Sequence, residues 1–362
     1  MGKSTIKLTR KIQVQIDLPT KEERKEKLDK LYQYQNRCFR AANIMVSHMY
    51  VQEMIKDFFY LSEGIKYKLA DEKKDEDGIL QRSRINTTYR MISDRFRGEI
   101  PIDILSSLNN NLLSTFNKNK SEYWQGQCSL KNFKREMAFP FPPKSMGRIS
   151  YKPEKKAFCF RLFSIPFKTY LGKDFTDKRK LLERLVVGDI KLCTSHIKVK
   201  DGKTFWLAVF EIEKESNGLD PALIAEASLS LEYPIIVKVG KTKFTIGTKE
   251  EFLYRRLAIQ VAYKRAQIGA TYSRSGKGRK RKLKAVDRLR KAESNYVHHR
   301  IHVYSRRLID FCTKHRAGTL ILLNKVDIAK KEEFVLRNWS YYELMTKIKY
   351  KAEKAGIELI VG

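Results

Sequence analysis

The chain has 362 residues, 42% of them hydrophobic and 32% charged, which is enough material for two or three domains with buried cores. Its 74 Lys and Arg outnumber its 41 Asp and Glu, so the formal net charge is +33 at pH 7. That imbalance favours a polyanionic partner, above all nucleic acid. A membrane partner is disfavoured because no apolar run approaches the ~20 residues of a spanning helix. No signal-peptide pattern opens the chain, so we expect a cytoplasmic, nucleoid-associated protein.

The cysteine and histidine pattern does not predict a metal or a cofactor. No two of the five cysteines have C-x-x-C spacing, so neither a zinc ribbon nor a disulfide framework is supported. His298 and His302 have the four-residue spacing that can ligate a metal, but no third ligand lies near them in the sequence. We therefore expect free thiols, no zinc and no other cofactor.

The first part of the chain predicts one strand followed by a helical domain. Apolar residues alternate between Ile6 and Ile16, as in a strand that pairs with a later part of the sequence. Helical periodicity then covers Lys21–Tyr60 and Ile85–Phe96, and it returns after Pro101. These segments predict a helical domain of about 130 residues.

The middle of the chain predicts a small antiparallel sheet or barrel. The apolar period changes from helical to alternating after the prolines at 140, 142 and 143. Two later runs, Ile197–Lys200 and Lys203–Glu213, flank the Asp201-Gly202 turn that is typical of a two-residue hairpin. The N-terminal strand could complete this sheet, and the polar segment Glu215–Gly218 is the expected linker to the last domain.

The last part of the chain has the pattern of an α/β domain. A strand pair with a turn is expected over Ser228–Val239, and a helix starts at Glu250. The short apolar run Thr319–Leu323 predicts a buried strand, which is followed by Asn324. The next helix should begin at a capping box formed by Ser340 and Glu343 and end before Gly356, and the final strand should follow it.

The densest basic run lies inside this last domain. Such a run is often only a solvated face, but its length in a chain already at +33 favours contact with phosphates. The residues that we expect to bind nucleic acid here are Arg279, Lys280, Arg281, Lys282, Lys284 and Arg288.

Several of these stretches together resemble one family. Leu336–Leu344 and Tyr350–Ile357, preceded by Gly247–Leu253 and Arg279–Lys282, resemble in order and spacing the transposon-encoded TnpB proteins and the miniature type V CRISPR effectors. The resemblance is most specific over Glu226–Gly362 and architectural before that.

The resemblance implies an α+β multidomain fold. It divides the chain into the N-terminal strand of a wedge barrel (1–18), an inserted helical recognition domain (19–147), the rest of the antiparallel wedge β-barrel (148–216), and a degenerate, truncated RNase H-like (RuvC-like) α/β domain (217–362). Within the family, the basic run lies beside the guide–target heteroduplex, where contacts to the backbone position the duplex without reading its sequence.

The nuclease centre of this family departs from its pattern here. With Tyr233-Pro234 as the anchor, the first metal-binding Asp corresponds to Ser228 and the second acid to Asn324, and a third Asp and a four-Cys zinc element would lie beyond Gly362. Two-metal phosphodiester chemistry needs clustered carboxylates, and Ser and Asn are neutral. We therefore expect an inactive nuclease centre and no enzymatic activity.

The resemblance also implies partners and further binding residues. Guide RNA and target double-stranded DNA are expected, with Arg337 near the second vestigial position as a contact. Arg37, Arg40 and Asn43 lie on the first helix, where family members read a short duplex motif beside the target. Binding without cleavage would regulate transcription, either as a roadblock or by recruiting RNA polymerase or a sigma factor. A second copy on one guide RNA is also implied.

Two alternatives stay open at this point. An active nuclease could have rebuilt its metal site from acids near the vestigial positions in the sequence, namely Asp220, Glu226, Glu232 and Asp327. The chain could also be a simple RNA-binding protein that does not target DNA.

Overall fold

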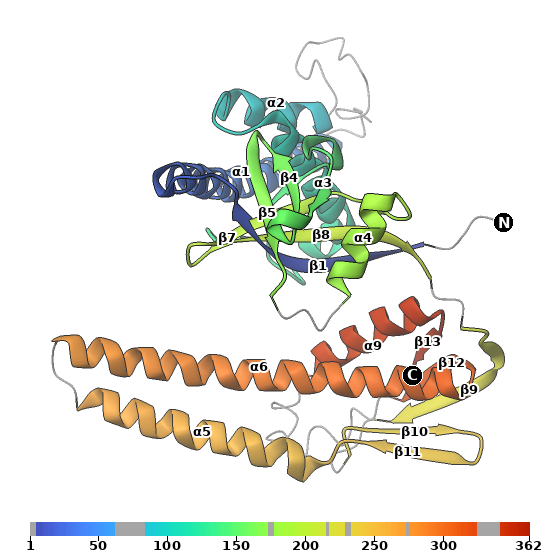
Figure 1. Cartoon of the computed structure of the whole chain (residues 1–362). Coiled ribbons are helices and arrows are strands. Elements are labelled where there is room, and N and C mark those ends of the chain that lie inside the picture. The colour runs from blue at the N-terminus through green and yellow to red at the C-terminus, as the bar shows by residue number, and fades with distance from the viewer. Residues whose placement is uncertain are drawn as a thin grey trace. The chain divides into compact units, whose positions relative to one another are not determined.

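The computed structural model describes residues 5–61, 84–172, 177–214, 217–228, 233–272, 276–323 and 341–362. By its contacts the chain divides into two units, Lys7–Ile212 and Met1–Ile6 with Glu213–Gly362. Figure 1 shows both units, and each is described here by itself.

The first unit is built on an eight-stranded sheet with the order β2-β7-β8-β1-β5-β4-β3, in which β6 also pairs with β8. Its strands are β1 (Thr5–Ile16), β2 (Phe139–Phe141), β3 (Ser150–Lys152), β4 (Ala157–Leu162), β5 (Ile165–Tyr170), β6 (Lys191–Leu192), β7 (Ser195–Lys200) and β8 (Lys203–Glu213). The N-terminal strand β1 was predicted to pair with a later part of the sequence, and in the structure it lies inside the sheet, between β8 and β5. The order is an open path among the described strands, so closure into a barrel stays a prediction.

Alternation of side chains explains how this sheet forms a core. Every second residue of β8 is buried, and Trp206 and Phe210 are fully enclosed. The β7–β8 hairpin turns at Asp201 and Gly202, whose φ angles of 51° and 71° are those that a two-residue hairpin loop requires. The predicted hairpin is therefore confirmed.

Three helices lie between β1 and β2 in the sequence: α1 (Lys21–Leu61), α2 (Arg84–Arg95) and α3 (Ile102–Trp124). All three were predicted. Helix α1 is attached to the sheet through Gln35, whose side chain donates to the carbonyl of Val199 (3.0 Å) and accepts from its amide (2.7 Å).

Several elements of the first unit were not predicted individually, and β2 and α4 are two of them. Strand β2 contains Pro140, and it is tolerated because β2 is the edge strand of the sheet. Helix α4 (Lys178–Val187) ends at Gly188 with φ of 93° and buries only Leu181 and Leu182. So small an apolar face gives little periodic signal.

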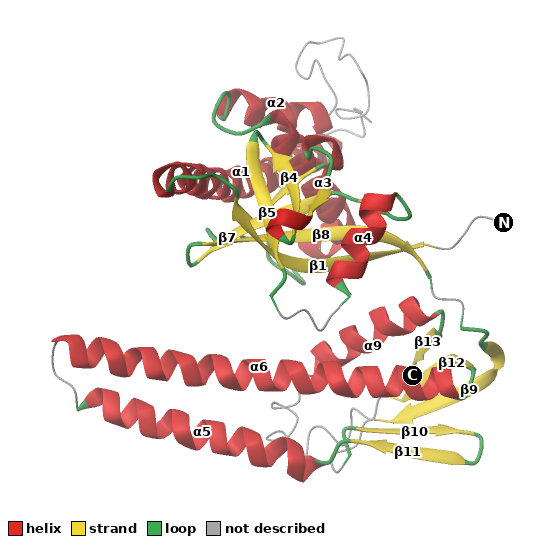
Figure 2. Ribbon diagram, viewed as in Figure 1, coloured by secondary structure: helices red, strands yellow, loops and turns green. Residues whose placement is uncertain are grey.

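The second unit has a five-stranded sheet with the order β11-β10-β9-β12-β13. Its strands are β9 (Asp220–Ser228), β10 (Ile235–Val239), β11 (Thr242–Ile246), β12 (Ala317–Leu323) and β13 (Glu358–Val361). Strands β9, β10 and β11 are antiparallel, and β12 is parallel to both β9 and β13. Figure 2 shows the strands of both units in yellow.

The prediction of a strand pair over Ser228–Val239 placed the first strand wrongly. Strand β9 begins at Asp220 and ends at Ser228. Its alanines and Pro221 have low strand propensity, so the sequence pattern hid it. Pairing with β12 on one side and β10 on the other overrides that propensity.

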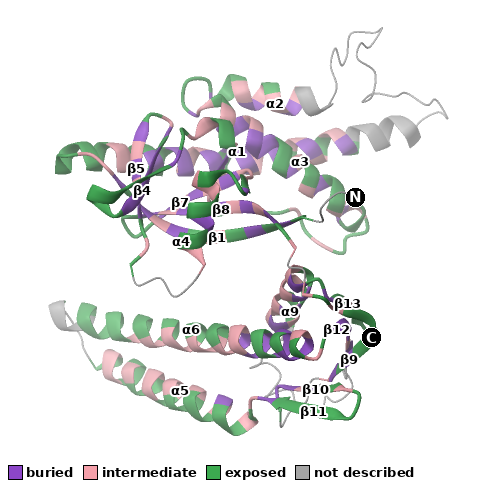
Figure 3. Cartoon of the chain, turned by 45° about the vertical axis from the view of Figure 1, so that its right-hand side comes forward, coloured by how far each residue is buried: buried purple, intermediate pink, exposed green. Residues whose placement is uncertain are grey.

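Helices α5 (Lys249–Thr271), α6 (Gly276–Lys314) and α9 (Tyr341–Ala355) complete the second unit. Its core gathers around Phe252, Ile301, Leu308, Leu320 and Ile348. Figure 3 shows that the buried part of α6 is the end near the sheet, whereas the other end is exposed. None of the described helices of the protein is long and apolar enough to cross a membrane.

Candidate nucleic-acid interface

The candidate interface is carried by α5 and α6, which run antiparallel as a long hairpin (Figure 1). Helix α5 is capped by Thr248, the residue before its first turn, whose hydroxyl accepts a hydrogen bond from the amide of Glu251 (3.2 Å). Glu250 and Glu251 place negative charge in the first turn, where the helix dipole favours it. The start of the hairpin is therefore set by local sequence.

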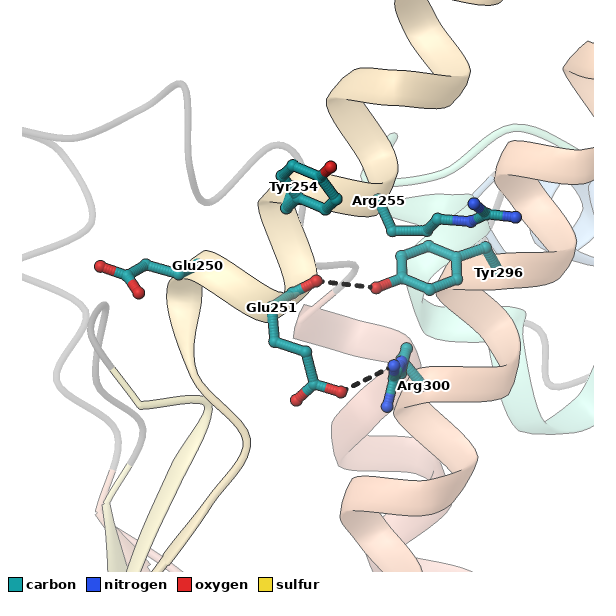
Figure 4. A pocket seen from close by; sticks show the side chains of 6 residues that line it. All are labelled: Glu250, Glu251, Tyr254, Arg255, Tyr296 and Arg300. Carbon is teal, nitrogen blue, oxygen red and sulfur yellow. Dashed lines mark hydrogen bonds and ion pairs between the residues drawn. The ribbon is translucent and has the colours of Figure 1, made fainter.

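Polar contacts between the two helices fix the base of the hairpin, around a pocket of about 510 Å³ (Figure 4). The Tyr296 hydroxyl donates to the carbonyl of Glu251 at 3.2 Å, and Arg300 forms an ion pair with the Glu251 carboxylate at 2.7 Å. The Arg300 guanidinium also lies 5.6 Å from the Tyr296 ring centroid. These contacts hold α6 at a defined register on α5.

A second set of polar contacts between α5 and α6 lies further along the hairpin. The Glu293 carboxylate accepts from Arg256 at 2.8 Å and from Gln260 at 3.0 Å. Burial acts to raise the pKa of Glu293, but these two hydrogen bonds outweigh it and the pKa is lowered. Glu293 is therefore held in its charged form, and it joins α5 to α6.

On the N-terminal side of Glu293, α6 is strongly basic. Between Gly276 and Lys291 it carries nine Lys and Arg and one acid, Asp287. The side chains of Lys280, Arg281, Lys282, Lys284 and Arg288 are all exposed, and none forms an ion pair with the described residues. We call these five residues the hairpin basic cluster. Arg279 belongs to the same helix, but its side chain lies outside what the structure describes.

The spacing within α6 brings part of this cluster to one face. Arg281, Lys284 and Arg288 follow each other at three and four residues, which is the spacing of neighbours along one helical stripe. Cations along one stripe of a straight, exposed helix can follow a phosphate backbone, and such contacts position a duplex without reading its bases.

The three residues predicted on α1 have different surroundings. Arg37 forms an ion pair with Glu99 (3.1 Å) and donates to its carbonyl (2.9 Å). The Asn43 side chain bonds both the carbonyl and the amide of Phe133 (3.1 and 2.8 Å). Arg40 is exposed. Arg37 and Asn43 thus have structural roles that the sequence did not reveal, and contact of the three with nucleic acid stays a prediction.

The carboxyl ends of strands β9 and β12 lie next to each other in the second sheet. Ser228 is the last residue of β9 and pairs with Leu323, the last residue of β12. Asn324 follows Leu323 directly but lies outside the described residues, as do Arg337 and the capping Ser340. Ser228 is half-buried. Parallel strands end at the same edge of a sheet, which explains this proximity.

Few carboxylates of the described residues lie near these strand ends. Glu226 is exposed two residues before Ser228, so it lies on the same face of β9. Asp220 is at the opposite end of the strand, roughly 26 Å away at ~3.3 Å per residue. Glu232 and Asp327 are outside the described residues. Within the described part of the chain, no three His, Cys, Asp or Glu side chains are grouped so as to hold a metal ion.

The histidine pair of α6 gains an acid from another element. His298 Nδ1 contacts the Glu343 carboxylate, which α9 supplies. Burial and the nearby Lys347 and Lys351 lower the pKa of His302 to about 4. The sequence could not reveal this acid, because 45 residues separate Glu343 from His298.

Comparisons with known proteins agree on one family, although no family model matches the chain. The chain is 25% identical over 264 residues to a CRISPR-associated endodeoxyribonuclease Cas12f1 of Sulfoacidibacillus thermotolerans, covering 68% of this chain and 62% of the relative. It is 23% identical over 310 residues to the Cas12f1 of Syntrophomonas palmitatica, covering 79% of this chain and 62% of the relative. A Cas12f1 of an uncultured archaeon is 25% identical over 193 residues. The chain thus spans less than two thirds of these relatives.

The fold gives an independent comparison. The structure of a Cas12f1–sgRNA–target DNA complex matches 99% of this chain and 89% of its own, with a TM-score of 0.63 and 16% identity. The sequence relatives and the fold both support the TnpB and miniature type V CRISPR effector family for this chain. The resemblance expected from the sequence is confirmed, together with an α+β fold that contains an antiparallel sheet.

One expectation needs correction within this family. We expected an inactive nuclease centre and no enzyme, because Ser228 and Asn324 replace the acids. All three relatives are named endodeoxyribonucleases, and this contradicts that expectation. The neutral residues at two positions were too narrow a basis, since residues from elsewhere in a fold can contribute to a site.

Proposed function

We propose that this protein is an effector that binds double-stranded DNA under the direction of a guide RNA. The observation that carries the proposal is the hairpin basic cluster, five exposed cations without ion pairs to described residues, in a member of this family. Base pairing between guide and target supplies the sequence information, and the cations contact the backbones. The matched Cas12f1 structure is a complex with sgRNA and target DNA, which supports these partners.

The topology of the two units supports a division of labour. The strand order of the second unit, with three antiparallel strands followed by two parallel ones, is that of an RNase H-like domain, so we assign Glu213–Gly362 as RuvC-like. The sheet of the first unit, with helices α1 to α3 inserted after β1, is assigned as the wedge with its recognition domain.

The first experiment identifies the RNA. The protein is purified from a host that carries its native locus, and the bound nucleic acid is sequenced. A discrete RNA with a fixed scaffold and a variable end that matches a DNA target is expected. A heterogeneous mixture that is removed by about 0.5 M salt would contradict guided binding and would favour the simpler RNA-binding protein.

The hairpin basic cluster is tested by neutralisation. Lys280, Arg281, Lys282 and Lys284 are changed together to Gln, and target binding by the RNA-loaded protein is measured against salt. Loss of four phosphate contacts should lower the slope of log K against log salt by roughly 3. The control changes Lys25, Lys118, Lys191 and Lys349, which are also exposed, to Gln. Equal slopes for the two variants would refute the role of the cluster.

We propose that stable binding to the DNA target regulates transcription. A protein held on a promoter blocks RNA polymerase, and one that recruits polymerase or a sigma factor activates it. A reporter with the guide-matched sequence in its promoter distinguishes the two by the sign of the change. No change relative to an unmatched promoter would contradict this use.

Cleavage of DNA is a second candidate function, favoured by the names of the three relatives. The described residue that we would test first is Glu226, since it lies on the same face of β9 as Ser228. Divalent-cation-dependent cleavage of guide-matched DNA should fall sharply on Glu226→Gln, whereas Asp220→Asn, at the far end of the strand, should leave it unchanged. Equal cleavage by both variants would exclude Glu226.

A further inference from the structure

A cationic pocket with exposed tyrosines lies in the first unit, on elements that carry none of the residues assigned to the interface above. It has a volume of about 600 Å³ and lies where β4 begins, β5 ends and α4 starts. A pocket of that size suits a single nucleotide, since ligand pockets span roughly 300–1,000 Å³. Among the described residues, its lining includes five cations and no acid; the cations are Lys155, Lys156, Lys168, Arg179 and Lys180.

Only part of this charge is neutralised. Asp17 forms ion pairs with Lys155 and with Lys168, the latter at 3.7 Å, and Glu183 pairs with Arg179 at 3.0 Å. Lys156 and Lys180 form no ion pair with the described residues. Ion pairs with two carboxylates thus involve three of the five cations, and Lys156 and Lys180 keep a positive charge that suits phosphates.

The aromatic side chains offer stacking surfaces. Tyr151 packs on Phe158 with ring centroids 5.1 Å apart, and the Arg179 guanidinium lies 5.8 Å from its ring. Tyr170 is 54% exposed at the end of β5. An exposed ring beside unpaired cations is the combination by which proteins bind single-stranded nucleic acid, with the base on the ring and the phosphates on Lys or Arg.

The fold holds these groups in place. Strand pairing sets Gln15 opposite Lys168 and Lys168 opposite Cys159. These three residues of β1, β5 and β4 therefore form one row across the sheet. Lys156 occupies the left-handed conformation with φ of 48°, at the turn before β4. The site is therefore assembled from segments more than 150 residues apart, on a sheet and not on a loop alone.

We propose that this pocket binds one unpaired nucleotide of a single strand, with its base on Tyr170 and its flanking phosphates on Lys156, Lys168 and Lys180. The Gln15 amide is placed beside Lys168 and can bond a ribose hydroxyl or a base edge. The pocket does not require guided DNA binding, so the two proposals can fail separately.

The location is tested by cross-linking. The full chain is irradiated with a short oligonucleotide of about six nucleotides that carries one 4-thiopyrimidine, prepared both as RNA and as DNA, and the adducts are mapped by mass spectrometry. Adducts in the segment with Tyr151 or Tyr170 are expected, and the RNA and DNA arms identify the strand. Adducts confined to the α5–α6 hairpin with both oligonucleotides would overturn the proposal.

The chemistry is tested by affinity. Tyr170→Ala should weaken binding of the favoured oligonucleotide roughly tenfold, and Tyr170→Phe should retain it because stacking needs only the ring. Lys156→Gln with Lys180→Gln should lower the salt slope by roughly 1.4, the value for two phosphate contacts on a single strand. Lys118→Gln with Lys191→Gln, equally exposed and equal in charge, is the control. The proposal is overturned if Ala and Phe at position 170 bind alike and the two double variants share one slope.

Discussion

Some side chains of this protein have structural roles that their residue type does not predict. Arg37 and Asn43 are polar residues on a helix, and a contact with nucleic acid was a natural expectation for them. In the structure, Arg37 bonds Glu99 and Asn43 bonds the backbone of Phe133. A polar side chain whose hydrogen bonds are made within the protein stabilises the fold, whatever else it contacts.

At this scale we predict the effect of Glu293→Gln, which keeps the shape of the side chain but removes its charge. Because the folded pKa of Glu293 lies below its ordinary value of 4.5, its ionised form stabilises the fold above about pH 4.5. That contribution is lost as the pH falls through the folded pKa. The variant should be less stable by about 1 kcal/mol at pH 7.

The measurement is thermal unfolding followed by circular dichroism at several pH values. The difference between the two proteins should be full at pH 7 and should shrink below about pH 4.5. Glu154→Gln, at an exposed position, is the matched control. A difference that grows as the solution is acidified would contradict the assignment.

Elements in this protein depend on their neighbours to different degrees. Helices α1 and α3 and the β7–β8 hairpin were predicted from local patterns, because periodicity and turn residues lie within each segment. Strand β9 was not, since its alanine-rich sequence forms a strand only between β10 and β12. Tertiary pairing decided that element.

Gly318 shows how close that pairing is. A Cβ at this position would lie 2.7 Å from the carbonyl oxygen of Asp220, a backbone atom of β9 that cannot move without disturbing the sheet. The register of β9 and β12 also shifts between Ala317 and Thr319. We expect Gly318→Ala to destabilise the protein by about 1–3 kcal/mol.

Gly269 is the comparison for this change, because it lies inside α5 with nothing within 4 Å of a Cβ. Gly269→Ala should stabilise by roughly 0.5–1 kcal/mol, through the lower backbone entropy of alanine in the unfolded chain. Chemical denaturation measures both variants. Equal effects would show that the close approach at Gly318 is not maintained.

The whole molecule is governed by its net charge of +33. Like charges repel over the length at which salt screens them, about 30 Å at 0.01 M and 10 Å at 0.1 M. The protein without nucleic acid should therefore unfold at a higher temperature as NaCl is raised across this range. Binding to nucleic acid should weaken over the same range.

Differential scanning calorimetry of the RNA-free protein tests the first effect, and KCl in place of NaCl serves as a control for specific ion binding. As NaCl is raised, thermal stability should increase and affinity for nucleic acid should decrease, because both depend on the positive charge of the chain. A melting temperature that falls with NaCl would contradict the repulsion argument.

The sequence by itself indicated nucleic acid as the partner that we propose, and it predicted most helices and the hairpin turn, because composition, periodicity and turn chemistry do not depend on the fold. It also carried the family resemblance. Only the tertiary structure decided which residues meet. Ser228 comes to lie beside Leu323, Glu343 beside His298, and Tyr170 within a pocket that α4 also lines. These residues are far apart along the chain, and strand pairing and helix packing bring them together.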